Sequence, residues 1–499
     1  MTKRRHTSTK SKGVDHSSLE DHTRVGSKLL PPLAQIPNFH SGSWIGQRIP
    51  EVIWAGLLFS NLHRGAVIGK VRELGAYMSQ VRGKDFQASD IYLSGLSELP
   101  LSIQEDTVEL LTTPDDFATA LSPLLLFDSL PAKDVWKKHL KGYAPEWGSL
   151  AIAVARLLDH QSQESTDCRW ATMYCMLIAG RLSFVAGAEE SAREIHDYPL
   201  YGDPALVRPT IRASEGALAA SLQWKSAWQN SFWKECLEKT GCFPLQERND
   251  AAAEPPTSIE KINLAYSQSK NLFMQTMLTS GVDSKHEAVF GFIFYSLGLL
   301  AELMRMNASQ AVSARLVLRT LLECYINLAY LVKKDDEELW KLYRVFGAGQ
   351  AKLSYLKLET SNDSPNYVTI DMLKALANED VWEEFLPIEL GHWANSDLRK
   401  MSEEAGLKEM YDRYYSWTSS YAHGHWGPIR DAAYEICGNP LHRLHRIPSE
   451  HFRLLPNVLP DACAIVDRIL HVAGQCYPEI QLRIGSEVSG LDVSADGPE

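Results

Sequence analysis

The chain has 499 residues, of which 45% are hydrophobic and 22% are charged, so it is long enough for two or three domains with full cores. Its formal net charge of −12 argues against a general nucleic-acid binder, because an acidic surface repels phosphates at long range. The eight cysteines form no Cys-x-x-Cys pair, and a disulfide scaffold is not expected at this length.

The first 30 residues differ in composition from the rest of the chain. They hold seven Lys and Arg against three Asp and Glu, so residues 31–499 carry a net charge of −16. The segment is polar and low in aromatics, which predicts a disordered basic tail and lead-in over residues 1–41. Because it lacks the apolar core of a signal peptide, we expect a cytoplasmic protein.

Residues 42–245 read as an N-terminal helical domain. The pattern over 49–78 predicts two amphipathic helices with a break near 61–65. Further helices are predicted over 114–125, 147–159, 171–184 and 209–239. We find no clean alternation of four or more apolar and polar residues between turn signals, so the predicted fold class is all-α.

A polar segment with a Pro-Pro pair, residues 246–257, predicts a linker to a C-terminal helical bundle over 258–484. Asn307 is predicted to cap the start of the third helix, with Gln310 as its partner. Residues 485–499 form an acidic tail. The helices of this half are predicted over 260–280, 284–306, 308–333, 336–360, 403–423, from 428 onward, and over 460–474.

The longest apolar run of the chain, residues 288–304, lies in this bundle. A bilayer span needs about 20 consecutive apolar residues. Gly291, Ser296, Gly298 and Glu302 interrupt the run, so we expect a buried helix and no membrane partner.

Three charged residues of the 308–333 helix, Arg315, Arg319 and Glu323, are spaced four apart and therefore share one face. An exposed pair of this kind does no more than stabilise its own helix by about 0.2–0.5 kcal/mol. Branched and aromatic residues fall among these charges, however, which favours a face packed against something. A charge that is buried must be paired, either within this set or with a ligand.

The 403–423 helix carries a second group of polar residues. Tyr415 and Ser419 lie on a stripe that leads to His423, and Gly424 and Gly427 must end the helix. The negative end of the helix dipole favours the charged imidazole, so His423 is a candidate general acid or phosphate contact, with His425 beside it. The alternative is a histidine hydrogen-bonded among core aromatics.

Metal and nucleotide motifs are missing from the sequence. His423, His425, His442, His445 and His451 fall within 29 residues, but no carboxylate-bearing metal motif such as His-Glu-x-x-His accompanies them. No phosphate-binding glycine loop is present either. We therefore predict no metal ligands and no cofactor.

Residues 284–430 resemble a bacterial family known only as a domain of unknown function. The resemblance rests on Arg-x-x-x-Glu at Arg319 and Glu323, on the aromatic run 325–330, and on Ser-x-x-x-His at Ser419 and His423. That family is similar to the HEPN superfamily of helical bundles, many of which are metal-independent ribonucleases of toxin–antitoxin and anti-phage systems. The resemblance implies Arg319, Glu323 and His423 as catalytic residues, with Arg315, Tyr415, Ser419 and His425 in binding. HEPN nucleases usually place an arginine four to six residues before the histidine, where this chain has Ser419, Thr418 and Trp417, so Arg319 would have to come from the neighbouring helix.

Two hypotheses for function follow. In the first, the chain is an RNA-cleaving or RNA-binding effector of a bacterial defence or toxin module, working without a metal and with a protein partner or as a homodimer. In the second, it is a non-catalytic helical sensor or scaffold that binds an anionic ligand or a partner protein.

Overall fold

The computed structural model describes residues 19–35, 42–182, 189–200, 207–220, 227–243, 256–360, 365–379, 381–382, 384–394, 396–443 and 445–485. These residues are mostly helical and include four strands of three residues each, which confirms the predicted all-α class. The chain divides into two compact units. Unit 1 comprises residues 1–245 and 436–446, and unit 2 comprises residues 246–435 and 447–499. The sequence analysis had placed residues 436–446 in the C-terminal bundle.

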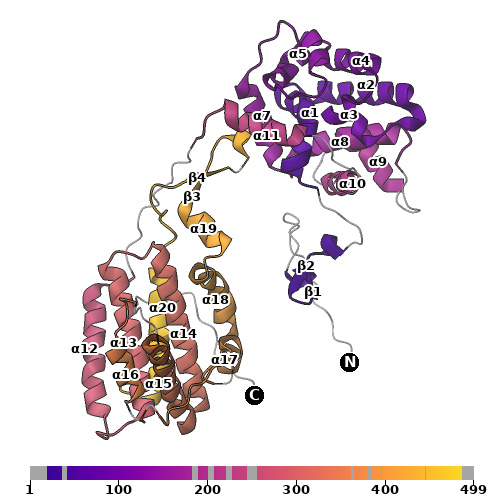
Figure 1. Cartoon of the computed structure of the whole chain (residues 1–499). Helices are drawn as coiled ribbons and strands as arrows, with labels where there is room; N and C mark the ends of the chain where they lie inside the picture. Colours follow the sequence, from indigo (N-terminus) through magenta and orange to yellow (C-terminus); the bar gives the residue numbers. More distant parts are fainter. Residues whose placement is uncertain are drawn as a thin grey trace, which may run out of the picture. The chain divides into compact units, whose positions relative to one another are not determined.

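Unit 1 is built around a helix that is buried on nearly every side. Residues 49–59 of α1 are all buried because the run IPEVIWAGLLF is almost entirely apolar, and α1 packs against α7 and α8 (Figure 1). The helices of unit 1 are α1 (Ile49–Asn61), α2 (Arg64–Arg82), α3 (Leu93–Leu96), α4 (Leu101–Thr112), α5 (Asp115–Leu121), α6 (Lys133–His139), α7 (Trp147–Leu158), α8 (Gln163–Ile178), α9 (Glu189–Asp197), α10 (Arg208–Ala220) and α11 (Trp228–Lys239).

A buried ion network lies within unit 1. The Glu215 carboxylate is 1% exposed and accepts from Arg48 at 3.0 Å, and Arg169 lies 3.4 Å from the same oxygen. The Arg169 guanidinium also lies over the Trp44 ring, 3.7 Å from its centroid. Burial lowers the pKa of Arg169 to about 10. Each of the two arginines therefore depends on Glu215 for charge compensation.

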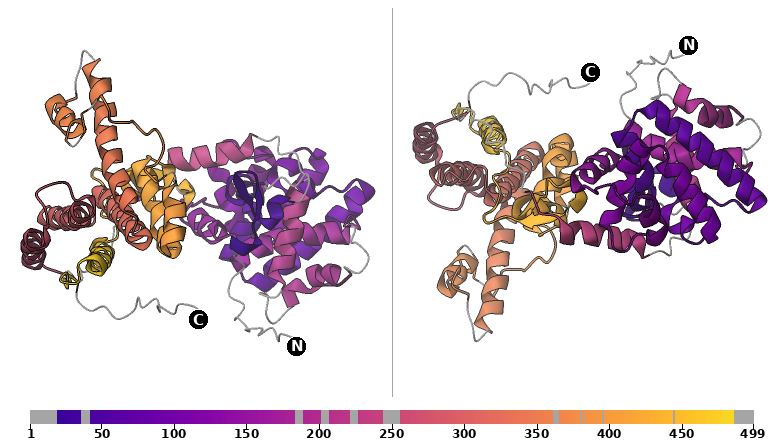
Figure 2. Two further views of the ribbon diagram at one scale, coloured as in Figure 1. Left: turned by 90° about the horizontal axis from the view of Figure 1, so that it is seen from below. Right: turned by 90° about the horizontal axis from the view of Figure 1, so that it is seen from above.

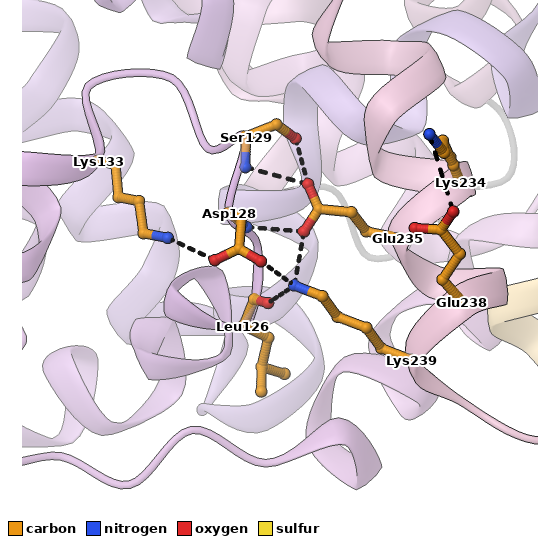
Figure 3. Close-up of polar contacts among 8 residues, drawn as sticks. All are labelled: Leu126, Asp128, Ser129, Lys133, Lys234, Glu235, Glu238 and Lys239. Carbon is orange, nitrogen blue, oxygen red and sulfur yellow. Dashed lines mark hydrogen bonds and ion pairs between the residues drawn. The ribbon is translucent and has the colours of Figure 1, made fainter.

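The C-terminal end of α11 is fastened by a surface cluster (Figure 3). Glu235 accepts from the backbone N–H groups of Asp128 and Ser129, at 2.7 and 3.0 Å. Lys239 donates to Asp128 at 2.7 Å, to Glu235 at 2.8 Å and to the carbonyl of Leu126 at 3.0 Å. These contacts fix the last turn of α11, which leads directly into residues 240–243.

Unit 2 is a helical bundle centred on α14, which packs against α13, α17, α18 and α20. Figure 1 shows α12, α13, α14 and α20 side by side, and Figure 2 shows α15 projecting from them with α16 against it. The helices of unit 2 are α12 (Ile259–Thr276), α13 (Ser284–Arg305), α14 (Val312–Lys334), α15 (Glu337–Glu359), α16 (Ile370–Ala377), α17 (Leu398–Ala405), α18 (Lys408–Ala422), α19 (Trp426–Ala433) and α20 (Leu459–Cys476).

Most predicted helices of the bundle are present, but the role assigned to Asn307 was wrong. The first residue before α14 is Ala311, and its side chain makes no capping hydrogen bond. Asn307 instead ends α13 with a φ of 49°. Its N–H donates to Met304 O and that of Ala308 to Leu303 O, both at 3.0 Å, which is a Schellman motif. Asparagine serves there because it tolerates the left-handed conformation.

Three predicted helices differ most from the observed ones. The predicted helix over 209–239 is two helices, α10 and α11, and the one predicted from 171 begins at Gln163. The helix predicted over 403–423 is divided into α17 and α18 at Gly406, whose φ of 79° is left-handed and ends α17.

Part of the predicted disordered tail is structured. Strands β1 (Thr23–Val25) and β2 (Lys28–Leu30) pair as an antiparallel hairpin that turns at Gly26, where φ is 60°. Both strands are largely exposed. Residues 1–18 and 36–41 of the predicted tail, and residues 486–499 of the predicted acidic tail, lie outside the described residues. Strands β3 (Tyr434–Ile436) and β4 (Arg446–Pro448) form a second pair.

Among the residues that the structure describes, one helix, α13, is long and apolar enough to cross a membrane by length and composition. Half of its most apolar 18-residue window is buried inside the structure, including Val289, Phe290 and Ile293. This partial burial agrees with the predicted buried helix. The cytoplasmic location stays a prediction.

Candidate functional site

Arg319 of α14 is held by side chains from two helices. Its Nε donates to Glu323 Oε1 at 2.8 Å, one turn along the same helix. Its Nη2 donates to the Tyr415 hydroxyl at 3.1 Å and its Nη1 to Ser419 Oγ at 3.3 Å, both on α18. Arg319 therefore faces the helix that bears His423, as the sequence analysis expected. Four predicted site residues meet in this cluster.

The guanidinium of Arg319 is partly shielded from solvent. The Arg319 side chain is 18% exposed and that of Glu323 is 36% exposed. Burial alone would lower the pKa of Arg319, but the hydrogen bond and charge of Glu323, together with Tyr415, raise it overall. Arg319 also lies over the Tyr415 ring, 5.0 Å from its centroid. The cluster thus holds a permanent positive charge in one orientation.

Helix α18 is itself fixed against the bundle. Tyr411 and Tyr415 stack with ring centroids 4.5 Å apart and an interplanar angle of 16°. The Tyr414 hydroxyl donates to Asp461 of α20 at 2.7 Å. The buried Thr418 turns its hydroxyl to the carbonyl of Tyr414 at 2.7 Å. These contacts set the position of Tyr415 and Ser419 relative to α14.

His423 and His425 are exposed at the end of α18. His423 is the C-terminal cap, its N–H donates to Ser419 O at 3.2 Å, and Gly424 follows with a φ of 60°. The two imidazole rings lie 5.9 Å apart, and His425 Nδ1 is 3.3 Å from Ser420 Oγ. His423 is therefore accessible, which contradicts the alternative of a core histidine.

Two tryptophans near these histidines are exposed, Trp417 by 54% and Trp426 by 63%. A Cβ at Gly427 would lie 2.8 Å from the Trp417 ring, so glycine at the start of α19 allows that ring to approach. Exposed aromatic rings of this kind offer stacking surfaces for nucleobases. Neither tryptophan was among the site residues predicted from the sequence, although both are close to His423 and His425 along the chain.

Arg315 is not part of this cluster. It is 6% exposed and donates to two backbone carbonyls, Ala311 O at 3.0 Å and Pro456 O. Burial lowers its pKa, partly offset by Tyr421 and Asp431. Arg315 thus ties the first turn of α14 to residue 456. Leu316, one of the branched residues among these charges, is 40% exposed, although that face was expected to be packed.

A cavity of about 470 Å³ opens beside Glu323, between α13, α14 and α15. Arg344 in its wall pairs with Glu287 and lies 3.3 Å from Glu379. Burial raises the pKa of Tyr295 in the same wall. Glu323 is therefore shared between the Arg319 cluster and the cavity. The cavity is lined among others by Glu287, Tyr295, Glu323, Asn327, Tyr343 and Arg344.

A larger cavity, of about 670 Å³, is lined by the first turns of α13 and α15. Four of its charged residues form two ion pairs, Lys285 with Asp335 at 2.6 Å and Lys341 with Glu337 at 2.8 Å. None of the predicted site residues lines it. We therefore regard the cavity beside Glu323 as the relevant one.

The histidine run that raised the metal question is divided between the units. His423, His425 and His451 lie in unit 2, and His442 and His445 lie in unit 1. Within the described part of the chain, one group of side chains converges as metal ligands would, namely Cys242, Cys437 and His442, all in unit 1. This group gives no local signal in the sequence, because about 195 residues separate the two cysteines.

Residues 294–433 match DUF5677, a family of unknown function. The expectation that the C-terminal half contains a domain of unknown function is therefore confirmed. The match includes Arg319, Glu323, Tyr415, Ser419 and His423. No curated protein and no solved structure matches the chain.

Proposed function

We propose that unit 2 carries a metal-independent RNA-cleaving or RNA-binding site, in a HEPN-like bundle that serves a bacterial defence or toxin module. One observation carries the proposal. Arg319 of α14 is oriented by Glu323, Tyr415 and Ser419, and Ser419 lies one helical turn before the exposed His423 on α18. A fixed cation on α14 and an accessible imidazole at the end of α18 are two groups that can promote phosphodiester cleavage through the 2′-hydroxyl.

The roles of the residues follow from their contacts. Arginine has five N–H donors, and three of those of Arg319 are engaged by the neighbours named above, which leaves two for phosphate oxygens. His423 would take the proton of the 2′-hydroxyl or protonate the leaving oxygen. Trp417 and Trp426 offer stacking surfaces for the flanking bases. RNA binding through base stacking and one fixed arginine is compatible with the negative net charge of the chain, because neither contact requires a broad basic surface.

The test is RNA cleavage by the purified full chain. Cleaved RNA should carry a 2′,3′-cyclic phosphate or 3′-phosphate end, and activity should persist in EDTA. His423→Ala should lower the rate by about 10²–10⁴-fold. His451→Ala is the matched control, since His451 is also an exposed histidine of unit 2.

A growth assay in bacteria is the simplest first step. Expression of the wild type should slow growth and expression of His423→Ala should not. Equal growth for both, with no RNA cleavage alongside any partner protein encoded nearby, contradicts a nuclease.

The cavity beside Glu323 favours a second candidate function, a non-catalytic sensor. Its volume of about 470 Å³ lies within the range of roughly 300–1,000 Å³ that is usual for small-molecule sites. Its arginine is paired with Glu287 and its second glutamate, Glu323, with Arg319, so a neutral polar ligand fits better than the anionic one expected from the sequence.

Native mass spectrometry of the full chain tests the sensor function. A bound small molecule should disappear in Gly291→Leu, because Gly291 lines the cavity and has open space around a new side chain. Gly298→Leu is the control, since Gly298 lies on the same helix with equal space but does not line the cavity. A ligand that survives in both variants argues against this cavity.

A further inference from the structure

Three metal-ligating side chains of unit 1 point at one another. The Nδ1 atom of His442 lies 3.4 Å from Cys242 Sγ and 3.4 Å from Cys437 Sγ. All three ligand atoms lie within 4.8 Å of one another. Cys437 and His442 are buried, and Cys242 is exposed. The group therefore has a closed side and a side open to solvent.

These separations fit a tetrahedral zinc ion. Zn–S bonds of about 2.3 Å and Zn–N bonds of about 2.1 Å at the tetrahedral angle place sulfur and nitrogen about 3.6 Å apart. The observed distances of 3.4 Å are close to that value. Two thiolates and an imidazole are also ligands that zinc prefers.

The hydrogen bonds around His442 direct a lone pair at the two sulfurs. Thr240 Oγ1 donates to the carbonyl of Cys236 at 2.6 Å, so its single proton is engaged. In the 2.9 Å hydrogen bond between Thr240 Oγ1 and His442 Nε2, the imidazole must therefore be the donor. The proton lies on Nε2, and Nδ1 is left as a ligand atom. The lone pair of His442 Nδ1 can accept a hydrogen bond from only one of the two thiols, whereas a single metal ion could bind the imidazole and both sulfurs.

The two segments that carry the ligands are tied together by further hydrogen bonds. Asn439 Nδ2 donates to Gly241 O at 2.7 Å, and the Gly438 N–H donates to Phe243 O. The Phe243 N–H donates to Cys437 Sγ at 3.4 Å, so this sulfur is held in place by the segment that carries Cys242. Upstream, the cluster shown in Figure 3 fixes the last turn of α11. The ligands are thus positioned before any ion binds.

We propose that Cys242, Cys437 and His442 form a zinc site, with water as the fourth ligand on the exposed side of Cys242. The ion would join the end of α11 to the 3-10 helix η9 (Pro440–His442), which packs against α7 and α11 within unit 1. The site lies outside residues 294–433 and is independent of the proposed RNA chemistry.

The experiment uses the reduced full chain. Elemental analysis should find one zinc per chain, and cobalt should produce the charge-transfer bands of a thiolate complex. Cys242→Ser should lose both signals and keep its helical circular dichroism, because Cys242 is exposed. A chelator should lower the melting temperature of the wild type and leave that of Cys242→Ser unchanged.

Cys476→Ser is the matched control, since Cys476 is partly exposed and lies in unit 2. It should bind zinc as the wild type does. A reduced wild type that binds neither zinc nor cobalt overturns the proposal. So does a wild type that is isolated without zinc and two hydrogens lighter through a Cys242–Cys437 bond, since the pair would then be a disulfide in the native protein.

Discussion

Replacing Arg319 by alanine should destabilise unit 2 well beyond the cost of an ordinary surface ion pair. The substitution removes the hydrogen bonds to Tyr415 and Ser419, the ion pair with Glu323 and the contact with the Tyr415 ring. It leaves no buried charge unpaired, because Glu323 is 36% exposed and water can solvate it. The expected loss therefore comes from the broken contacts alone.

The contacts allow an estimate of the size of this loss. Hydrogen bonds of a partly shielded arginine are each worth about 1 kcal/mol after solvent competition. The ion pair adds about 0.5 kcal/mol and the cation–π contact about as much again. Together the loss should be about 2–3 kcal/mol, which corresponds to roughly 5–10 °C in melting temperature for a unit of this size.

Differential scanning calorimetry of the full chain measures the effect. The matched control is Arg413→Ala, because Arg413 pairs with Glu409 at the same four-residue spacing on α18 but is 44% exposed. That change should cost about 0.5 kcal/mol or less. If Arg319→Ala lowers the melting temperature no more than Arg413→Ala does, the Arg319 cluster is not a packed site and the reasoning fails.

Three further predictions concern unit 1 and the tail. Glu215→Ala should destabilise unit 1 by about 3–5 kcal/mol in urea unfolding, because it leaves two buried arginines uncompensated, whereas the exposed Glu238→Ala should have little effect. Hydrogen bonds and charges from Lys239 and then Lys133 lower the pKa of Asp128 to about 2 from its usual 3.8. A carboxyl group whose pKa is lower in the folded state stabilises the fold at pH values above its unfolded pKa, and this stabilisation is lost as the pH falls to the folded pKa. Between pH 3.8 and about pH 2, the wild type should therefore lose more stability than Asp128→Asn. Deleting residues 1–35 should leave the melting temperature unchanged, because the described strands of the tail are exposed, and a large drop would show that the tail docks on the fold.

The helical class and much of the bundle could be predicted from the sequence because helical periodicity and proline positions are local signals. The starts of α1, α7 and α13 were found to within a residue. The Arg319 contact with α18 was also predictable, since both stripes were visible and a partly buried arginine needs partners. By contrast, Asn307 was misassigned because an asparagine suits both a helix start and a left-handed helix end.

Features that depend on distant residues could not be predicted in the same way. Cys242 and Cys437 carry no spacing signal, and they come together only because residues 436–446 belong to unit 1. The exposure of His423 depends on how α18 ends beside α19. The cavity beside Glu323 depends on the packing of three helices.

The division of unit 1 between two stretches of chain has a consequence for synthesis on the ribosome. Leu441 is 1% exposed and belongs to the core of unit 1, yet it is made roughly 200 residues after Leu245. At a translation rate of about 5–20 residues per second, Leu441 would be synthesised roughly 10–40 s after Leu245. Throughout that interval unit 2 is being translated while part of the unit 1 core stays open. A chain interrupted before residue 436 would never close it, so translation must pass residue 446 before unit 1 is complete.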